Sequence, residues 1–237
     1  MKNGKIINLL PPLYVLLGLG AWKLHDWMMG SFVEDPVSGL LPFGTLPEIL
    51  IWVLTGCVIA AAFVLTRHAG MGAGSPIIGA LSNAFFAAGT LTLLLEDAKG
   101  PAALVLVYRV FCVLTAVCLA VSAVMQLLKK KPFFLLELSP CVLCVLVLLE
   151  YYQFFSEVPQ LMNYVLGLGA VLCLALGAYH RMARAAGLPD RPYYFAIGLM
   201  AVYFCAAAGA QGVYVSFFCS AAVWMAAEMA RLRPAEG

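Results

Sequence analysis

Charged residues are scarce in this sequence: Asp, Glu, Lys and Arg make up 11% of its 237 residues. Domains that fold in water carry about 25%. Hydrophobic residues reach 64%, which leaves too little polar sequence for a soluble catalytic domain outside a membrane. The composition therefore predicts a protein that lies almost wholly within a lipid bilayer.

Basic clusters and histidines are scarce as well. The formal net charge is +2, whereas a nucleic-acid-binding domain has a clustered basic surface. The sequence has three histidines, and each falls at or beyond the end of a hydrophobic stretch, whereas a haem or metal centre in a bundle would need them inside. We therefore expect no nucleic-acid partner, no metal and no cofactor, and we assign no catalytic residue.

Hydrophobic stretches long enough to cross a bilayer occur eight times, since a spanning helix takes about 20 apolar residues. They predict an all-α integral membrane helical bundle of about eight transmembrane helices, in one domain over residues 1–237. The first stretch also has the basic start of a signal peptide, but we interpret it as a retained helix. The expected spans are Ile6–Trp22, Pro47–Thr66, Ile77–Leu95, Ala102–Leu128, Phe133–Phe155, Leu161–Tyr179, Tyr193–Ala210 and Val213–Ala230.

Basic residues fall in alternate breaks between these stretches, and the other breaks are mainly acidic. Since Lys and Arg accumulate in cytoplasmic loops, both termini are expected in the cytoplasm. The outer segment 24–45 mixes aromatic, acidic and proline residues, as in a loop at the membrane surface; a re-entrant lid is the alternative. The residues that set the orientation are Lys2, Lys5, Arg67, Lys129, Lys130, Lys131, Arg181, Arg184, Arg191, Arg231 and Arg233.

The two halves of the chain show similar segments in the same order. Residues 46–54 resemble residues 158–166, and each of these segments opens a span with Pro followed by Glu or Gln. Two parallel four-helix repeats, 1–131 and 132–237, would be related by a pseudo-two-fold axis along the membrane normal, with a cavity between them. Chance similarity of apolar helices is the alternative.

Cysteine is the residue type that most suggests chemistry, because Cys141 and Cys144 form a Cys-x-x-Cys pair. A redox pair needs a stabilised thiolate, but this pair lies well inside its span among apolar neighbours. We expect these thiols to pack as small hydrophobic groups. Small residues at intervals of four, at Gly169, Cys173 and Gly177 and at Ala84 and Ala88, predict close helix contacts.

Polar residues inside the spans are the remaining candidates for a ligand site. Asn83, Tyr108 and Asn163 could line a polar pocket, or could form hydrogen bonds between helices. Two further carboxylates have simpler interpretations. Glu137 is expected to extend towards Lys129–Lys131, and Glu228 lies one helical turn from Arg231.

Arg109 and Glu150 are charged residues inside the expected spans that have no such simple interpretation. They lie about 10 Å and 8 Å from the outer ends of consecutive spans, so their depths match. A charge at membrane depth is usually paired or faces a cavity, which predicts an ion pair between them. Snorkelling of both side chains to the headgroups, or pairing of Arg109 with Glu96 or Asp97, are the alternatives.

The stretch from Val158 to Gly187, VPQLMNYVLGLGAVLCLALGAYHRMARAAG, resembles a group of uncharacterised polytopic membrane proteins of clostridial Firmicutes. The resemblance implies a bacterial plasma membrane. That group has no assigned activity, so the resemblance implies no catalytic residue.

Three function classes stay open. A transporter or small-molecule-binding bundle is favoured, with Arg109, Glu150, Asn83, Tyr108 and Asn163 as candidate ligand-binding residues and an unknown small molecule as ligand. An accessory or anchor subunit would instead bind a membrane-protein partner. A thiol- or lipid-modifying enzyme would need reactive groups clustered at one membrane face, and the sequence offers no such cluster.

Overall fold

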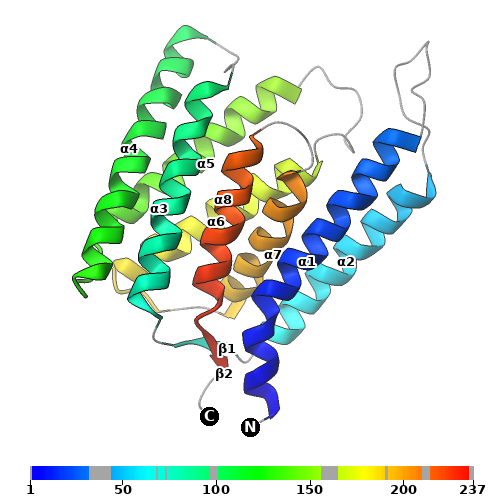
Figure 1. The fold of residues 1–237 in the computed structure, drawn as a ribbon, viewed down its shortest axis with the longest axis horizontal. Helices are drawn as coiled ribbons and strands as arrows, with labels where there is room; N and C mark the ends of the chain where they lie inside the picture. Colours follow the sequence, from blue (N-terminus) through cyan, green and yellow to red (C-terminus); the bar gives the residue numbers. More distant parts are fainter. Residues whose placement is uncertain are drawn as a thin grey trace.

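The computed structural model of the chain describes residues 2–31, 44–67, 69–72, 74–96, 101–155, 165–189, 192–209 and 214–234 (Figure 1). These residues form eight α-helices, one 3₁₀ turn and two short strands. The elements are α1 (Lys2–Ser31), α2 (Leu46–Thr66), β1 (Ala69–Met71), α3 (Pro76–Thr92), η1 (Leu93–Leu95), α4 (Ala102–Leu127), α5 (Phe134–Phe155), α6 (Val165–Ala185), α7 (Pro192–Ala208), α8 (Val215–Met229) and β2 (Leu232–Pro234).

The helices lie where the hydrophobic stretches predict them. Several begin at or next to a proline, as at Pro47, Pro76 and Pro192, because the first turn of a helix needs no donor at that position. Within the described residues, α2, α3 with η1, α4, α5 and α6 are long and apolar enough to cross a membrane. The helices α7 and α8 are apolar but shorter, with 17 and 15 residues.

Two helices form the centre of the bundle. The helix α7 packs against α1, α2, α6 and α8, and α8 also packs against α3. Figure 1 shows α1 and α2 at one edge of the molecule and α4 at the opposite edge. Every residue from 201 to 209 is buried, which reflects the central position of α7.

Small residues allow the close helix contacts. A Cβ atom at Gly169 would lie 2.9 Å from the Phe204 ring, and one at Gly177 would lie 2.8 Å from Met225, so the predicted stripe on α6 packs against α7 and α8. The pair Ala84 and Ala88 on α3 is exposed, so the packing predicted there is wrong. The buried face of α3 is the adjacent one, where Gly89 and Ser220 meet.

The strands β1 and β2 pair antiparallel, with Ala69 opposite Pro234. They join the end of the described chain to the connection between α2 and α3, and they lie at the same end of the bundle as the start of α1 (Figure 1). This strand pairing is not among the elements predicted from the sequence.

Two expectations about organisation differ from the structure. The helix α1 continues past Trp22 to Ser31, so the first part of the expected surface segment 24–45 is helical; residues 32–43 lie outside the described residues. The packing also departs from the expected two-fold arrangement of repeats 1–131 and 132–237. In a two-fold arrangement, the contact of α6 with α7 would recur between α2 and α3, and the contact of α1 with α7 would recur between α5 and α3. Within the described part, α7 packs on α6 and on α1, but α3 makes no comparable contact with α2 or α5.

Candidate functional site

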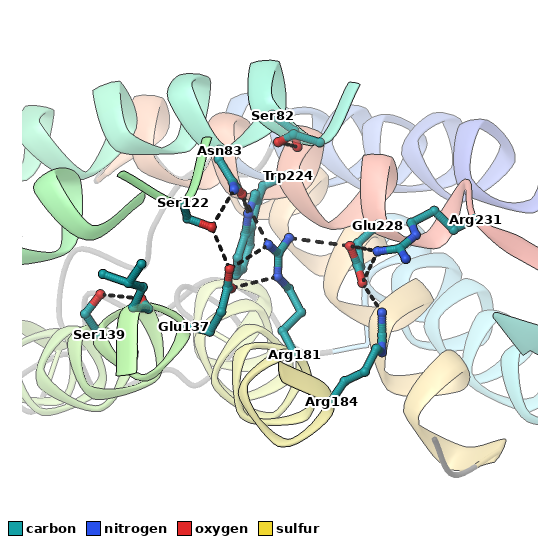
Figure 2. A network of polar contacts seen from close by, with 12 residues as sticks. Ser82, Asn83, Ser122, Glu137, Ser139, Arg181, Arg184, Trp224, Glu228 and Arg231 are labelled. Carbon is teal, nitrogen blue, oxygen red and sulfur yellow. Dashed lines mark hydrogen bonds and ion pairs between the residues drawn. The ribbon is translucent and has the colours of Figure 1, made fainter. Parts of the chain in front are cut away.

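Arg181 is the centre of a buried cluster of charged and polar side chains (Figure 2). Its Nε atom donates to Glu137 Oε2 at 3.1 Å, and its second terminal nitrogen donates to Glu137 Oε1 at 3.3 Å. The other terminal nitrogen donates to Glu228 Oε2 at 3.5 Å. One guanidinium group on α6 therefore joins carboxylates from α5 and α8, and the geometry towards Glu137 is the two-pronged one that suits arginine.

Asn83 and Ser122 extend the cluster into α3 and α4. Ser122 Oγ donates to Glu137 Oε1 at 2.8 Å, and Asn83 Nδ2 donates to Ser122 Oγ at 3.2 Å. Asn83 Oδ1 accepts a bond from Arg181 at 3.3 Å and one from Trp224 Nε1 at 2.7 Å. Asn83 thus fixes the position of both Arg181 and Trp224.

Glu228 forms the part of the cluster closest to the end of the bundle. Besides Arg181, its carboxylate accepts bonds from Arg184, from Arg231 at 3.4 Å and from the hydroxyl group of Tyr194 at 3.5 Å. The exposed fraction of the side chain rises from 8% at Arg181 to 21% at Arg184 and 35% at Arg231. The cluster therefore leads from a partly open end into a closed interior.

The depth of the cluster follows from the positions of its members along their helices. Glu228 is one residue from the end of α8, whereas Asn83 is seven residues from the start of α3, which corresponds to about 10 Å. Six helices contribute a side chain, α3 to α8. We call the set of Asn83, Ser122, Glu137, Arg181, Arg184, Tyr194, Trp224, Glu228 and Arg231 the charge cluster.

Burial of ionised groups makes the cluster energetically demanding. The side chains of Glu137, Arg181 and Glu228 are each at most 8% exposed. Bringing such ions out of water costs several kcal/mol each, roughly offset by their pairing, so a well-packed apolar substitute is often as stable. Stability alone does not account for these residues, and ionisable groups inside a membrane domain commonly mark a functional site.

Two of the five predicted site residues lie elsewhere in the interior. Tyr108 on α4 is 1% exposed and lies close enough to Glu150 on α5 to interact with it electrostatically. Glu150 is 2% exposed. These residues are nearer the opposite end of the bundle from the charge cluster, while Asn83 belongs to it. Asn163 lies outside the described residues.

Arg109 is exposed on the outer face of α4, and no ion pair joins it to Glu150 in the described part of the chain. The expected pair is therefore not formed. The buried face of α4 runs through Tyr108, Cys112 and Leu119, and Arg109 is offset from it by about 100°. Because α4 is apolar on all sides, the sequence alone did not reveal which face turns inward.

Sequence reasoning missed most of the charge cluster. Glu137 does not extend towards Lys129–Lys131 but is buried against Arg181, so that interpretation is wrong. Glu228 does contact Arg231, as expected, yet it is buried and shared with two further arginines. A signal for Arg181 exists in the sequence: it is the next position, four residues after Gly177, on the small-residue stripe of α6.

The two thiols of the Cys-x-x-Cys pair lie against neighbouring helices, whereas Cys57 and Cys219 are exposed. Cys144 is fully buried, and the thiol of Cys141 points to the carbonyl oxygen of Ala175 at 3.9 Å. In the described residues, no group of three or more His, Cys, Asp or Glu side chains is arranged to hold a metal ion.

Two surface grooves lie away from the charge cluster. One, with a volume of about 250 Å³, lies between α2, α6 and α7 and is lined by Trp52, Thr55, Gly169 and Phe204 among others. The second, about 540 Å³, lies on α4 next to Arg109. Both are lined almost entirely by apolar groups.

No protein-family model, curated protein or solved structure matches the chain.

Proposed function

We propose that this chain is a small-molecule transporter or small-molecule-binding bundle whose working centre is the charge cluster. The observation that carries the proposal is Arg181, a guanidinium group buried among apolar helices and held between Glu137 and Glu228. Ionised groups at such positions serve substrate or ion pathways in many membrane proteins.

Placement in the membrane is part of the proposal. Eight spans would put the start of α1 and the end of β2 on one side, as in Figure 1. The connection 128–133, with its lysines, and Arg231 would face the same side, which the distribution of basic residues makes the cytoplasmic one. The resemblance to clostridial membrane proteins supports a bacterial plasma membrane.

The arrangement of the charge cluster supports a role in a conformational change. Its members come from six helices, so a movement between α3–α5 and α6–α8 would separate charged partners. A ligand that replaces a lost partner lowers the free-energy cost of this movement. Such a ligand binds the two conformational states with different affinities. Access from the cytoplasmic end would pass Arg231 and Arg184 before it reached Arg181.

Trp224 offers a direct test, because its ring lies against Arg181 and next to Asn83. Replacement of Trp22, Trp27 and Trp52 by Phe leaves Trp224 as the single tryptophan of the four. The purified variant is titrated with amino acids, carboxylic acids, sugars, nucleosides, polyamines and inorganic ions. We expect one class to give a saturable change in Trp224 emission.

Arg181→Lys is the informative variant, because lysine keeps the charge but loses the two-pronged geometry. We expect it to weaken binding about tenfold, equivalent to 1.4 kcal/mol, while Arg67→Gln, which removes an exposed charge outside the cluster, leaves binding unchanged. Uptake of the labelled ligand into proteoliposomes then separates a transporter from a binding protein. If no solute class changes the emission, the proposal is wrong, and a membrane protein that copurifies would favour the accessory subunit instead.

A further inference from the structure

The outward face of α4 carries a charge that no described residue neutralises. Arg109 is exposed and forms no hydrogen bond or ion pair with any described residue. In particular, Glu96 and Glu150 do not pair with it, and Asp97, the other expected partner, lies outside the described residues. Arg109 therefore differs from Arg181, whose charge is fully compensated inside the protein.

The position of Arg109 makes an unneutralised charge unfavourable. It lies seven residues after the start of α4, about 10 Å along the helix axis. A charged side chain costs up to about 3 kcal/mol at the bilayer centre and less towards the edge, where it extends to the headgroups. An anion at this depth would remove that cost.

A shallow apolar groove lies beside Arg109. It is wide open, with a volume of about 540 Å³, and the hydrocarbon part of Arg109 belongs to its lining. Val113 and Val117 follow at intervals of four residues on the same face, so the lining extends about 12 Å along α4 towards the middle of the helix. The other lining residues are Leu94, Val110 and Leu114.

We propose that this groove binds a phospholipid, with the phosphate group at Arg109 and an acyl chain along Val113 and Val117. A phospholipid has a phosphate group next to a hydrocarbon chain, which matches an arginine next to an apolar groove. A guanidinium group can donate two parallel hydrogen bonds to two phosphate oxygens. Basic pockets on membrane helices bind headgroups in the same way.

The lining favours a lipid over a partner helix. Helices that associate in a membrane approach through Gly, Ala or Ser, whereas the apolar lining of this groove consists of Val and Leu. Their exposed fractions, 54% at Val110 and 46% at Val113, leave room for a flexible chain. The site is independent of the charge cluster and of its ligand, and it rests on the membrane placement proposed above.

Native mass spectrometry of the delipidated full-length protein tests the site with two probes, dioleoyl phosphatidylglycerol and dioleoylglycerol, which lacks the phosphate. Arg109→Gln should weaken binding of one phosphatidylglycerol molecule about tenfold, the value of one charge-assisted bond, and should leave dioleoylglycerol binding unchanged. Arg67→Gln, which removes another exposed arginine, is the matched control and should bind both lipids as the original protein does.

Val113→Trp provides a second variant that keeps Arg109 and fills the groove. Because Val113 is exposed, the substitution should not affect folding, which size-exclusion chromatography verifies. We expect it also to weaken phosphatidylglycerol binding. Equal binding by the original protein and Arg109→Gln would overturn the proposal, and so would dioleoylglycerol binding as tightly as phosphatidylglycerol. Loss of a stoichiometric protein partner in Arg109→Gln would assign the groove to a helix.

Discussion

The guanidinium group of Arg181 lies over the indole ring of Trp224, with 4.6 Å between Cζ and the ring centroid. The indole ring also stacks on Phe86, with 4.6 Å between ring centroids. Trp224 therefore joins the charge cluster to the apolar core between α3 and α8. Its N–H group bonds to Asn83, which also holds Arg181, so Arg181 and Trp224 are fixed by the same amide oxygen.

Trp224→Phe should lower the free energy of unfolding by about 1 kcal/mol, because phenylalanine keeps an aromatic ring at this position but lacks the donor to Asn83. For a chain of this size, that corresponds to a decrease of about 2–4 °C in melting temperature. Thermal unfolding in detergent measures it. Trp52→Phe is the control, since Trp52 is 45% exposed, and should leave the melting temperature unchanged. Equal melting temperatures for both variants would contradict the role given to the indole N–H group.

Arg181→Gln should have a larger effect, because it leaves the Glu137 carboxylate buried without its cation. Removal of one partner of a buried pair costs about 3–5 kcal/mol, which predicts a melting temperature lower by roughly 10 °C. Adding Glu137→Gln removes the remaining charge, so the double variant should recover part of the loss. Glu228 retains Arg184 and Arg231 in both cases.

The exposed pair of Lys23 and Asp26 is the matched control for this comparison. Lys23→Gln should change the melting temperature by very little, because exposed ion pairs contribute about 0–1 kcal/mol. A double variant as unstable as Arg181→Gln alone would mean that the loss comes from packing or from the bonds to Asn83, and not from the uncompensated carboxylate.

Helix positions could be predicted from the sequence because they depend on the length of apolar runs, and α2, α4 and α5 lie within one or two residues of the expected spans. The charge cluster could not be predicted from the sequence. Its members come from segments far apart in the chain, and the helices that carry them are apolar on all sides. Periodicity therefore did not reveal that Glu137 and Arg181 face each other, or that Arg109 faces outward.

Cysteine accessibility tests the membrane placement. After replacement of the eight cysteines by Ala, Glu96→Cys and Lys130→Cys introduce single thiols at exposed positions near opposite ends of α4. If the termini are cytoplasmic, an impermeant maleimide added to intact cells should label the Glu96→Cys protein only. Permeabilised cells should show labelling of both. Labelling of the Lys130→Cys protein alone in intact cells would mean the reverse orientation.

Gly18 tests the attachment of α1 to the central helix α7. A Cβ atom at Gly18 would lie 2.5 Å from the Tyr203 carbonyl oxygen and 2.7 Å from Ala206 Cβ, so the two backbones would have to separate. Overpacking of this kind costs about 1–3 kcal/mol. Gly18→Ala should therefore lower the melting temperature by several degrees and reduce the folded yield.

Gly20 lies two residues further along the same helix, and a Cβ atom there would have no neighbour within 4 Å. Gly20→Ala is the control for Gly18→Ala, because it also replaces a glycine of α1 by alanine. Any general effect of alanine on the stability of α1 is therefore the same in both variants. Because alanine favours the helix, Gly20→Ala should leave the melting temperature unchanged or slightly higher. The difference between the two variants then measures the contact of α1 with α7. Equal melting temperatures would show that α1 can shift away from Tyr203 without loss, and that it is not held against α7 by close packing.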